Sequence, residues 1–328
     1  MKKAILVFAA LLGLTLTALA PAKTFLTIGS GGYTGTYYPV AVGIAKIINT
    51  NMSDVRANAI STGGSLYNVI ALETGSLQLA MAQNDTSYYA YTGTVIDKVI
   101  GKPTKRLRGI ASLYTQPIHI IARRDSKIES VADMRGRKVY VGDIGSGTEQ
   151  NTKLILKSYG MGFDDLAAVV HGKAGQAVQM LVNGDIDAMF FSAAVGSRAF
   201  VDAAKSGDVV FLSIDQEHLD KLQRNYPFYS QLTVPAGTYP NQEQAFTSIA
   251  VHSLLVTTAD LSEDLVYRIA KLLFVDKAQD FKSIKPVLEK YFDVRKALEG
   301  MSIPIHKGAA KLYQELGVPI PDRVAPID

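Results

Sequence analysis

The segment Gly29–Pro39 reads GSGGYTGTYYP and directly follows the short apolar run Phe25–Ile28. The residues after it place Val40 and Ile44 on one face at helical spacing. An apolar run, a turn made of glycine and hydroxyl residues, and an amphipathic helix are the parts of a βα unit. The segment therefore predicts an α/β fold.

Two later stretches repeat this plan. Residues 55–75 run from VRANAIS through TGGS into LYNVIALETG, and residues 137–161 run from RKVYVGD through IGSGTEQ into NTKLILKSYGM. The first and third units lie far apart in the chain, which indicates two lobes of similar construction and not a short repeat array.

Two long β-rich segments, Leu113–Arg123 and Ala245–Ala259, are the candidates for strands that cross between the lobes. We therefore expect an α/β, two-lobed protein of the type II periplasmic binding protein kind, with these strands as a hinge. The expected division is 23–115 plus 254–328 for lobe 1 and 116–253 for lobe 2.

The first 22 residues resemble a secretory signal peptide. Lys2 and Lys3 precede an uncharged apolar run that ends in small residues, and we expect cleavage near residue 22. A retained membrane anchor is the alternative, although the run is short for a bilayer span. Cysteine is absent and the formal net charge is only +4, so we expect a periplasmic protein without disulfides that does not bind nucleic acid.

The turns themselves suit an anion. A helix begins with unpaired backbone N–H groups and a partial positive charge, and glycine lets a ligand approach that backbone closely. Hydroxyl groups add directional donors. The alternative is that these residues only make tight connections. The hydroxyl residues at or beside the three turns are Thr34, Thr36, Ser61, Thr62, Ser65, Ser146 and Thr148.

Aromatic and polar residues also follow the expected strand ends. Tyr33 and Tyr89 suit either a ligand site or the core, and the choice stays open at this point. Asn84 and Asp85 end the strand-like run before Tyr89 and offer oxygen acceptors that fit an ammonium group.

Enzyme and cofactor motifs are missing. The turns fit neither the dinucleotide fingerprint nor the P-loop, and the five histidines have no metal-ligand spacing. The sequence has neither a Gly-x-Ser-x-Gly elbow nor a cysteine nucleophile. We therefore expect a protein that is not an enzyme and that has no cofactor and no metal.

Four motifs in order, TGTYYP (34–39), STGGSLYN (61–68), AQND (82–85) and GSGTE (145–149), closely resemble those of a known family. It is the TAXI branch of the solute receptors of tripartite ATP-independent periplasmic (TRAP) transporters. The resemblance extends through NGDIDAMF (183–190) and LSEDLVYRIAKLLF (261–274). It implies a binding protein that closes around a small anionic or zwitterionic solute, such as glutamate or a related dicarboxylate, and delivers it to a TRAP permease.

The resemblance also implies a set of ligand contacts. Together with the residue-based reasoning it gives the ligand-binding residues Gly32, Tyr33, Thr36, Ser61, Ser65, Asn84, Tyr89, Ser146 and Thr148. The dicarboxylate branch of these transporters uses an arginine, and these loops contain none. How a second carboxylate would be neutralised is therefore open.

Two other functions remain as alternatives. The same fold can serve an ATP-driven (ABC) importer or a sensor kinase, and a secreted hydrolase or transferase can use a cleft of this kind.

Overall fold

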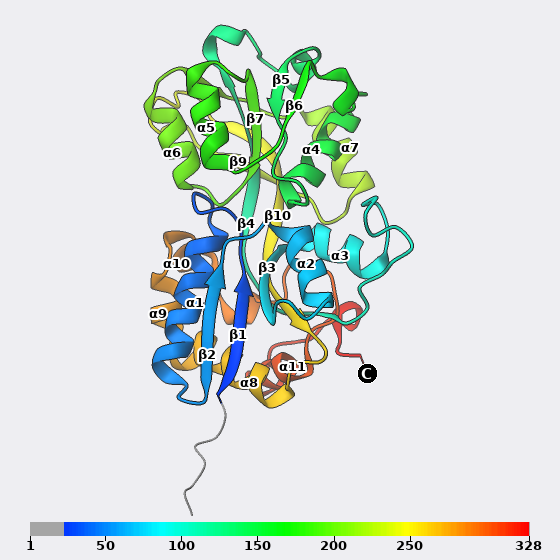
Figure 1. Cartoon of the computed structure of the whole chain (residues 1–328), viewed down its shortest axis with the longest axis vertical. Coiled ribbons are helices and arrows are strands. Elements are labelled where there is room, and N and C mark those ends of the chain that lie inside the picture. Colours follow the sequence, from blue (N-terminus) through cyan, green and yellow to red (C-terminus); the bar gives the residue numbers. More distant parts are fainter. Residues whose placement is uncertain (1–22, 328) are drawn as a thin grey trace, which may run out of the picture.

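A computed structural model describes residues 23–327, so the predicted signal peptide lies outside the described residues. The chain forms two lobes joined by two long strands (Figure 1). The first six elements belong to one lobe. They are β1 (Thr24–Gly29), α1 (Tyr37–Asn51), β2 (Val55–Ile60), α2 (Ser65–Glu73), β3 (Leu79–Gln83) and α3 (Asn84–Thr92).

Strand β1 lies between β2 and β3 and is parallel to both. Its alternation buries Leu26 and Ile28, while Phe25 remains exposed. Helix α1 buries Val40 and Ile44 against the sheet, which confirms the face expected from their spacing. Parallel strands followed by helices bring the strand ends, and hence the helix beginnings, to one edge of the lobe.

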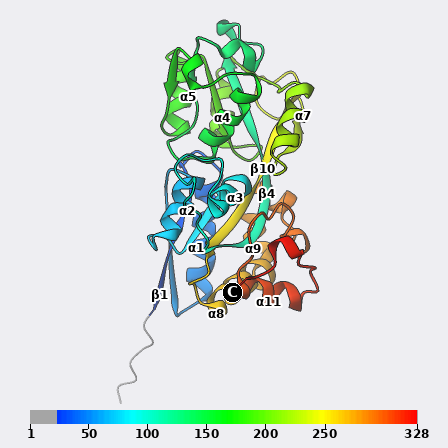
Figure 2. The ribbon, with the colours of Figure 1, turned by 90° about the vertical axis from the view of Figure 1, so that its right-hand side faces the viewer.

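The two linking strands are β4 (Leu107–Arg123) and β10 (Phe246–Thr258). They pair antiparallel with each other. Strand β10 also pairs with β3 of the first lobe and with β9 of the second, while β4 pairs with β7 and β8 of the second lobe. Nearly every residue of β4 is buried, because other elements cover both of its faces (Figure 2). The register between β4 and β10 shifts after Ser253 and again after Leu255, so the ribbon is irregular next to the lobe boundary. The predicted division points, 115/116 and 253/254, fall inside these strands.

The second lobe is built between the two crossings. Strand β5 pairs in parallel with β6 and β7. Strands β7 and β8 pair antiparallel with the C-terminal part of β4, and β9 pairs antiparallel with the N-terminal part of β10. Its elements are β5 (Lys138–Tyr140), α4 (Gly147–Ser158), β6 (Ala168–Val170), α5 (Ala174–Asn183), β7 (Ala188–Ser192), α6 (Arg198–Lys205), β8 (Val209–Phe211), α7 (Gln216–Asn225) and β9 (Ser230–Val234).

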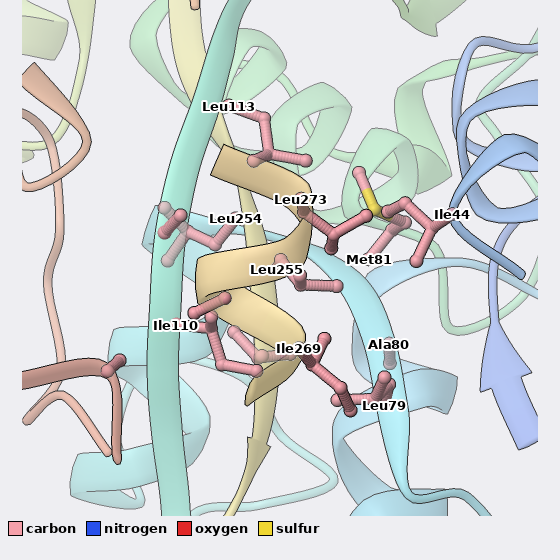
Figure 3. Packing of buried hydrophobic residues seen from close by; sticks show 14 of the residues in the cluster. Ile44, Leu79, Ala80, Met81, Ile110, Leu113, Leu254, Leu255, Ile269 and Leu273 are labelled. Atoms are coloured by element: carbon pink, nitrogen blue, oxygen red, sulfur yellow. The ribbon is translucent and has the colours of Figure 1, made fainter. Parts of the chain in front are cut away.

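After β10 the chain returns to the first lobe. Helix α8 (Glu263–Lys271) continues into a π-helical turn (Leu272–Asp276), and α9 (Ala278–Ser283), α10 (Pro286–Tyr291) and α11 (Lys307–Glu315) follow. Figure 3 shows Ile269 and Leu273 of this segment packing on Met81 of β3 and Leu255 of β10. The core of the first lobe thus joins residues from both ends of the sequence.

Candidate functional site

A cavity of about 60 Å³ lies where the two lobes meet. Both lobes contribute backbone and polar side chains to it, chiefly from strand ends and helix beginnings. The lining residues are Gly31, Gly32, Gly35, Thr36, Tyr37, Thr62, Gly63, Gly64, Ser65, Gln83, Gln116, Tyr140, Asp143, Ser146, Gly147, Thr148, Gly172, Lys173, Ala174, Phe191 and Ser192.

Four helices begin at this cavity. The first residues of α1, α2, α4 and α5 are Tyr37, Ser65, Gly147 and Ala174, and all four line it. Two of these helices come from each lobe. Helix beginnings carry partial positive charge and unpaired N–H groups, so their convergence favours a negatively charged ligand group.

Three hydroxyl groups at the cavity can donate hydrogen bonds to a ligand. The hydroxyl oxygen of Thr36 accepts the N–H of Ala194 at 3.3 Å. That of Thr148 accepts the N–H of Ser192 at 3.1 Å. In the same way, Ser146 caps α4 by accepting a backbone N–H at 3.0 Å. Because these oxygens already accept a hydrogen bond, and none of the three donates one to a described residue, their hydrogens are available to a ligand oxygen.

Two charged side chains, Lys173 and Asp143, are the charged members of the described lining. The ammonium of Lys173 is paired with the carboxylate of Asp143 in the same lobe. It also donates to the carbonyl oxygen of Thr62, in the other lobe, at 3.0 Å. The side chains therefore bring no net charge to the cavity, and the positive potential comes from the helix beginnings.

The lobes touch along a seam beside the cavity. The N–H of Tyr67 donates to the carbonyl of Gly145 at 3.1 Å, and the hydroxyl of Ser197 donates to the carbonyl of Thr34 at 3.2 Å. A Cβ placed on Gly147 would lie 2.1 Å from the side-chain oxygen of Gln83 in the opposite lobe. The seam has the geometry of a closed cleft, and the missing side chain of Gly147 permits the approach.

A family model described as NMT1-like matches residues 28–317, which is most of the chain. The chain belongs to the NMT1-like family. Among solved structures, a protein of Bordetella bronchiseptica RB50 is 17% identical, with a TM-score of 0.50 over 92% of this chain and 91% of that one.

A structure from a study of glutathione import by Streptococcus mutans is 12% identical to this NMT1-like chain. The match covers 81% of this chain and 95% of that one, with a TM-score of 0.50. An ancestral arginine-binding protein is 16% identical, with a TM-score of 0.49 over 83% of this chain and 100% of that one. Two α/β lobes joined by two crossing strands make this the periplasmic binding protein fold, as the sequence predicts.

Five of the nine residues predicted to bind ligand in this NMT1-like chain line the cavity. They are Gly32, Thr36, Ser65, Ser146 and Thr148. The hydroxyl oxygen of Ser65 also accepts the N–H of Gln83 at 3.1 Å, so it helps to hold the end of β3.

The structure places the other four outside the cavity lining. Tyr33 is 70% exposed and packs edge-on against Tyr38. The hydroxyl of Ser61 donates to the carbonyl of Gly31 at 2.9 Å. Tyr89 is buried and contributes to the hydrophobic packing between α3 and the second lobe. These positions fit roles in local structure.

Asn84, the fourth of these, is bound into the hinge. Its side-chain oxygen accepts the N–H of His252 in β10 at 3.1 Å, and its amide donates to the carbonyl of Gly300 at 3.1 Å. The hydroxyl of Ser302 donates to the Asn84 carbonyl at 2.6 Å. Asn84 thus ties β3 and α3 to the crossing strand and to the C-terminal segment.

Asp85 lies next to it and is fully buried. Its carboxylate accepts hydrogen bonds from the N–H of Thr86 at 2.6 Å and from the side-chain amide of Asn151, on α4, at 2.7 Å. Burial raises the pKa of Asp85 to about 6, although these donors favour the ionised form. The Asp85–Asn151 bond joins the two lobes outside the cavity lining.

The sequence reasoning missed Lys173, Asp143 and the buried glutamine Gln116. Lys173 precedes α5, whose beginning lacks the Gly/Ser/Thr turn that marks the other three helices, although Gly172 beside it was a usable signal. The hydroxyl of Tyr37 accepts from Gln116 at 3.2 Å, and burial raises the pKa of that tyrosine to about 12.

Within residues 23–327, no three or more His, Cys, Asp or Glu side chains are grouped so that they could hold a metal ion. Over the same residues, no helix has the length and apolar character of a membrane span.

Proposed function

We propose that this chain is an exported solute-binding protein that captures a small anionic or zwitterionic solute between its lobes and delivers it to a membrane importer. The observation that carries the proposal is the convergence of four helix beginnings, two from each lobe, on one small cavity. A solute that bridges these helix beginnings is held fully only when the lobes are together, which couples capture to closure.

The energy of such binding is sufficient without an arginine. Each hydrogen bond to a charged group contributes roughly 1.5 to 3 kcal/mol. The hydroxyls of Thr36, Ser146 and Thr148, with backbone N–H groups of the helix beginnings, supply about five such donors. After roughly 4 kcal/mol or more for lost ligand freedom, about 8 kcal/mol for micromolar binding is within reach.

The proposed solute is glutamate or a related acidic amino acid or dicarboxylate. A cavity of about 60 Å³ suits a molecule of this size better than an oligosaccharide or a peptide. Lys173, the residue before α5, places at the cavity an ammonium that the predicted loops lack, and this ammonium is paired with Asp143 in the structure.

The proposed importer is a TRAP permease, which the resemblance of the glycine-rich motifs supports. An ABC importer is the second candidate, favoured by the fold match to the structure from the Streptococcus mutans study, which concerns glutathione import through a cystine ABC importer. Uptake of labelled glutamate into vesicles that contain a TRAP permease separates the two. TRAP transport needs this protein and an ion gradient, whereas ABC transport needs ATP.

Export is part of the proposal. N-terminal sequencing of the protein recovered from the periplasm should begin near Lys23, and a chain that keeps residues 1–22 and stays in the membrane fraction would refute cleavage.

The central test is a thermal-shift screen of the mature protein against amino acids, dicarboxylates and sugars. We expect stabilisation by acids and none by sugars. Stabilisation by sugars alone would contradict the proposal. Recovery of the acid unchanged after long incubation argues for binding, and conversion of the acid would favour a hydrolase or transferase.

A further inference from the structure

Two acceptors from opposite lobes converge on one ammonium group at the cavity. They are the carboxylate of Asp143 and the carbonyl oxygen of Thr62, and the ammonium is that of Lys173. Asp143 is itself held in place, since one of its carboxylate oxygens accepts the N–H of Ile144 at 3.0 Å and its carbonyl accepts the N–H of Ser146 at 2.9 Å. The acceptors are thus fixed by backbone contacts.

Lys173 is less fixed than the acceptors. Its side chain is 44% exposed and carries its charge on a flexible four-carbon stem. The ammonium can therefore leave the two acceptors and pair with another anion at the cavity, while Asp143 stays where it is.

The charges around the cavity discriminate between two kinds of acid. A dicarboxylate brings negative charge close to Asp143 and offers that carboxylate no positive partner. A zwitterionic amino acid satisfies both members of the pair, because its ammonium matches Asp143 and Thr62 while its carboxylate matches Lys173 and the helix beginnings.

We propose that Asp143 and Lys173 act together to select an acid that carries an ammonium group over one that does not. The ammonium of the solute replaces that of Lys173 between the Asp143 carboxylate and the Thr62 carbonyl, and Lys173 turns to the solute carboxylate. This inference rests on the proposed function and narrows its substrate class to amino acids.

The test compares L-glutamate with glutarate, which lacks only the α-ammonium. Titration calorimetry of the mature protein should show glutamate binding roughly 10 to 100 times more tightly, the change expected for one charge-assisted hydrogen bond. The Asp143→Asn variant should weaken glutamate binding and strengthen glutarate binding, which brings the two affinities to within about threefold. The Lys173→Met variant should weaken both acids.

Asp202→Asn is the matched control, because Asp202 is paired with Arg198 and Lys205 on the exposed face of α6, away from the cavity lining. It should leave the ratio of the two affinities unchanged.

The outcomes separate this inference from the proposed function. Equal binding of glutamate and glutarate by the unaltered protein, or an unchanged ratio in Asp143→Asn, overturns the selection by Asp143 and leaves acid capture intact. Binding of neither acid, nor of any other amino acid or dicarboxylate in the thermal-shift screen, defeats acid capture and the inference with it.

Discussion

The contact between Gly147 and Gln83 predicts that Gly147→Ala opposes closure of the lobes. The added Cβ would lie 2.1 Å from the side-chain oxygen of Gln83 and 2.3 Å from its carbonyl carbon. Gly147 is the first residue of α4 and is not among the residues with positive φ, so alanine fits its backbone. The clash exists only when the two lobes are together.

The expected magnitude follows from the cost of overpacking, typically about 1 to 3 kcal/mol. Because this cost applies to the closed state alone, it should appear as a rise in the dissociation constant of roughly 5-fold to 150-fold. Stability without ligand should stay the same or rise slightly, since alanine is a better helix former than glycine.

Calorimetric titration with the acid found in the screen measures the affinity, and small-angle X-ray scattering measures whether the lobes separate. Gly162→Ala is the control, since a Cβ on Gly162 meets nothing within 4 Å and its φ of −125° suits alanine. Gln83→Ala removes the side chain that the new Cβ meets. The double variant, with both Gly147→Ala and Gln83→Ala, should therefore bind the acid as tightly as the single variant Gln83→Ala. Unchanged affinity in Gly147→Ala, or no recovery in the double variant, would refute the reasoning.

Three further changes probe other contacts. Thr148→Ala should weaken acid binding about tenfold or more and lower the ligand-free thermal midpoint, because the buried N–H of Ser192 loses its acceptor; Thr148→Ser should restore both. Asn84→Ala should reduce the free energy of unfolding by roughly 1 to 3 kcal/mol in urea denaturation, because two partly buried backbone groups lose partners, and a loss below about 0.5 kcal/mol would contradict the hinge role. Asp85→Asn should change the pH dependence of stability.

The sign of the Asp85 effect follows from its raised pKa of about 6, against 3.8 for an exposed carboxyl. Between these values the folded protein keeps the proton that the unfolded chain has lost. The contribution of the Asp85 carboxyl group to the free energy of unfolding therefore falls as pH rises from about 4 to about 6, and it is constant above that. Between pH 4 and pH 7, the free energy of unfolding of Asp85→Asn should therefore rise by about 2.4 kcal/mol relative to that of the unaltered protein.

The comparison between the two proteins is needed because buried histidines act in the opposite sense. Burial lowers the pKa of His119 to about 3 and also lowers those of His252 and His306. Because the unfolded chain protonates these histidines first, they lower the free energy of unfolding as pH falls below about 6.5. Urea denaturation of both proteins at the two pH values cancels the histidine contribution, and a difference that does not vary with pH would contradict the raised pKa.

Local sequence was sufficient for the parts of the site that depend on local structure. A glycine and hydroxyl turn between a strand and a helix places its residues at a helix beginning, which is how Thr36, Ser65 and Ser146 came to line the cavity. The two crossing strands were also visible, because long β-rich segments are uncommon among short βα units.

Features that depend on tertiary contacts were not predictable in this way. Asn84 and Tyr89 follow a strand end, as ligand residues often do. Because β10 pairs with β3, however, Asn84 binds the backbone of β10, and Tyr89 packs in the hydrophobic core. Lys173 enters the cavity only because α5 of the second lobe faces the first lobe. No spacing within the sequence contains that information.

The placement of β10 between β3 and β4 has a consequence for biosynthesis. Gln83 pairs with Ser253, so the central sheet of the first lobe lacks a strand until about 170 more residues have left the ribosome. At roughly 5 to 20 residues per second, this takes on the order of ten seconds or more. The sheet of the first lobe is therefore incomplete during that interval, a condition that favours the export proposed above.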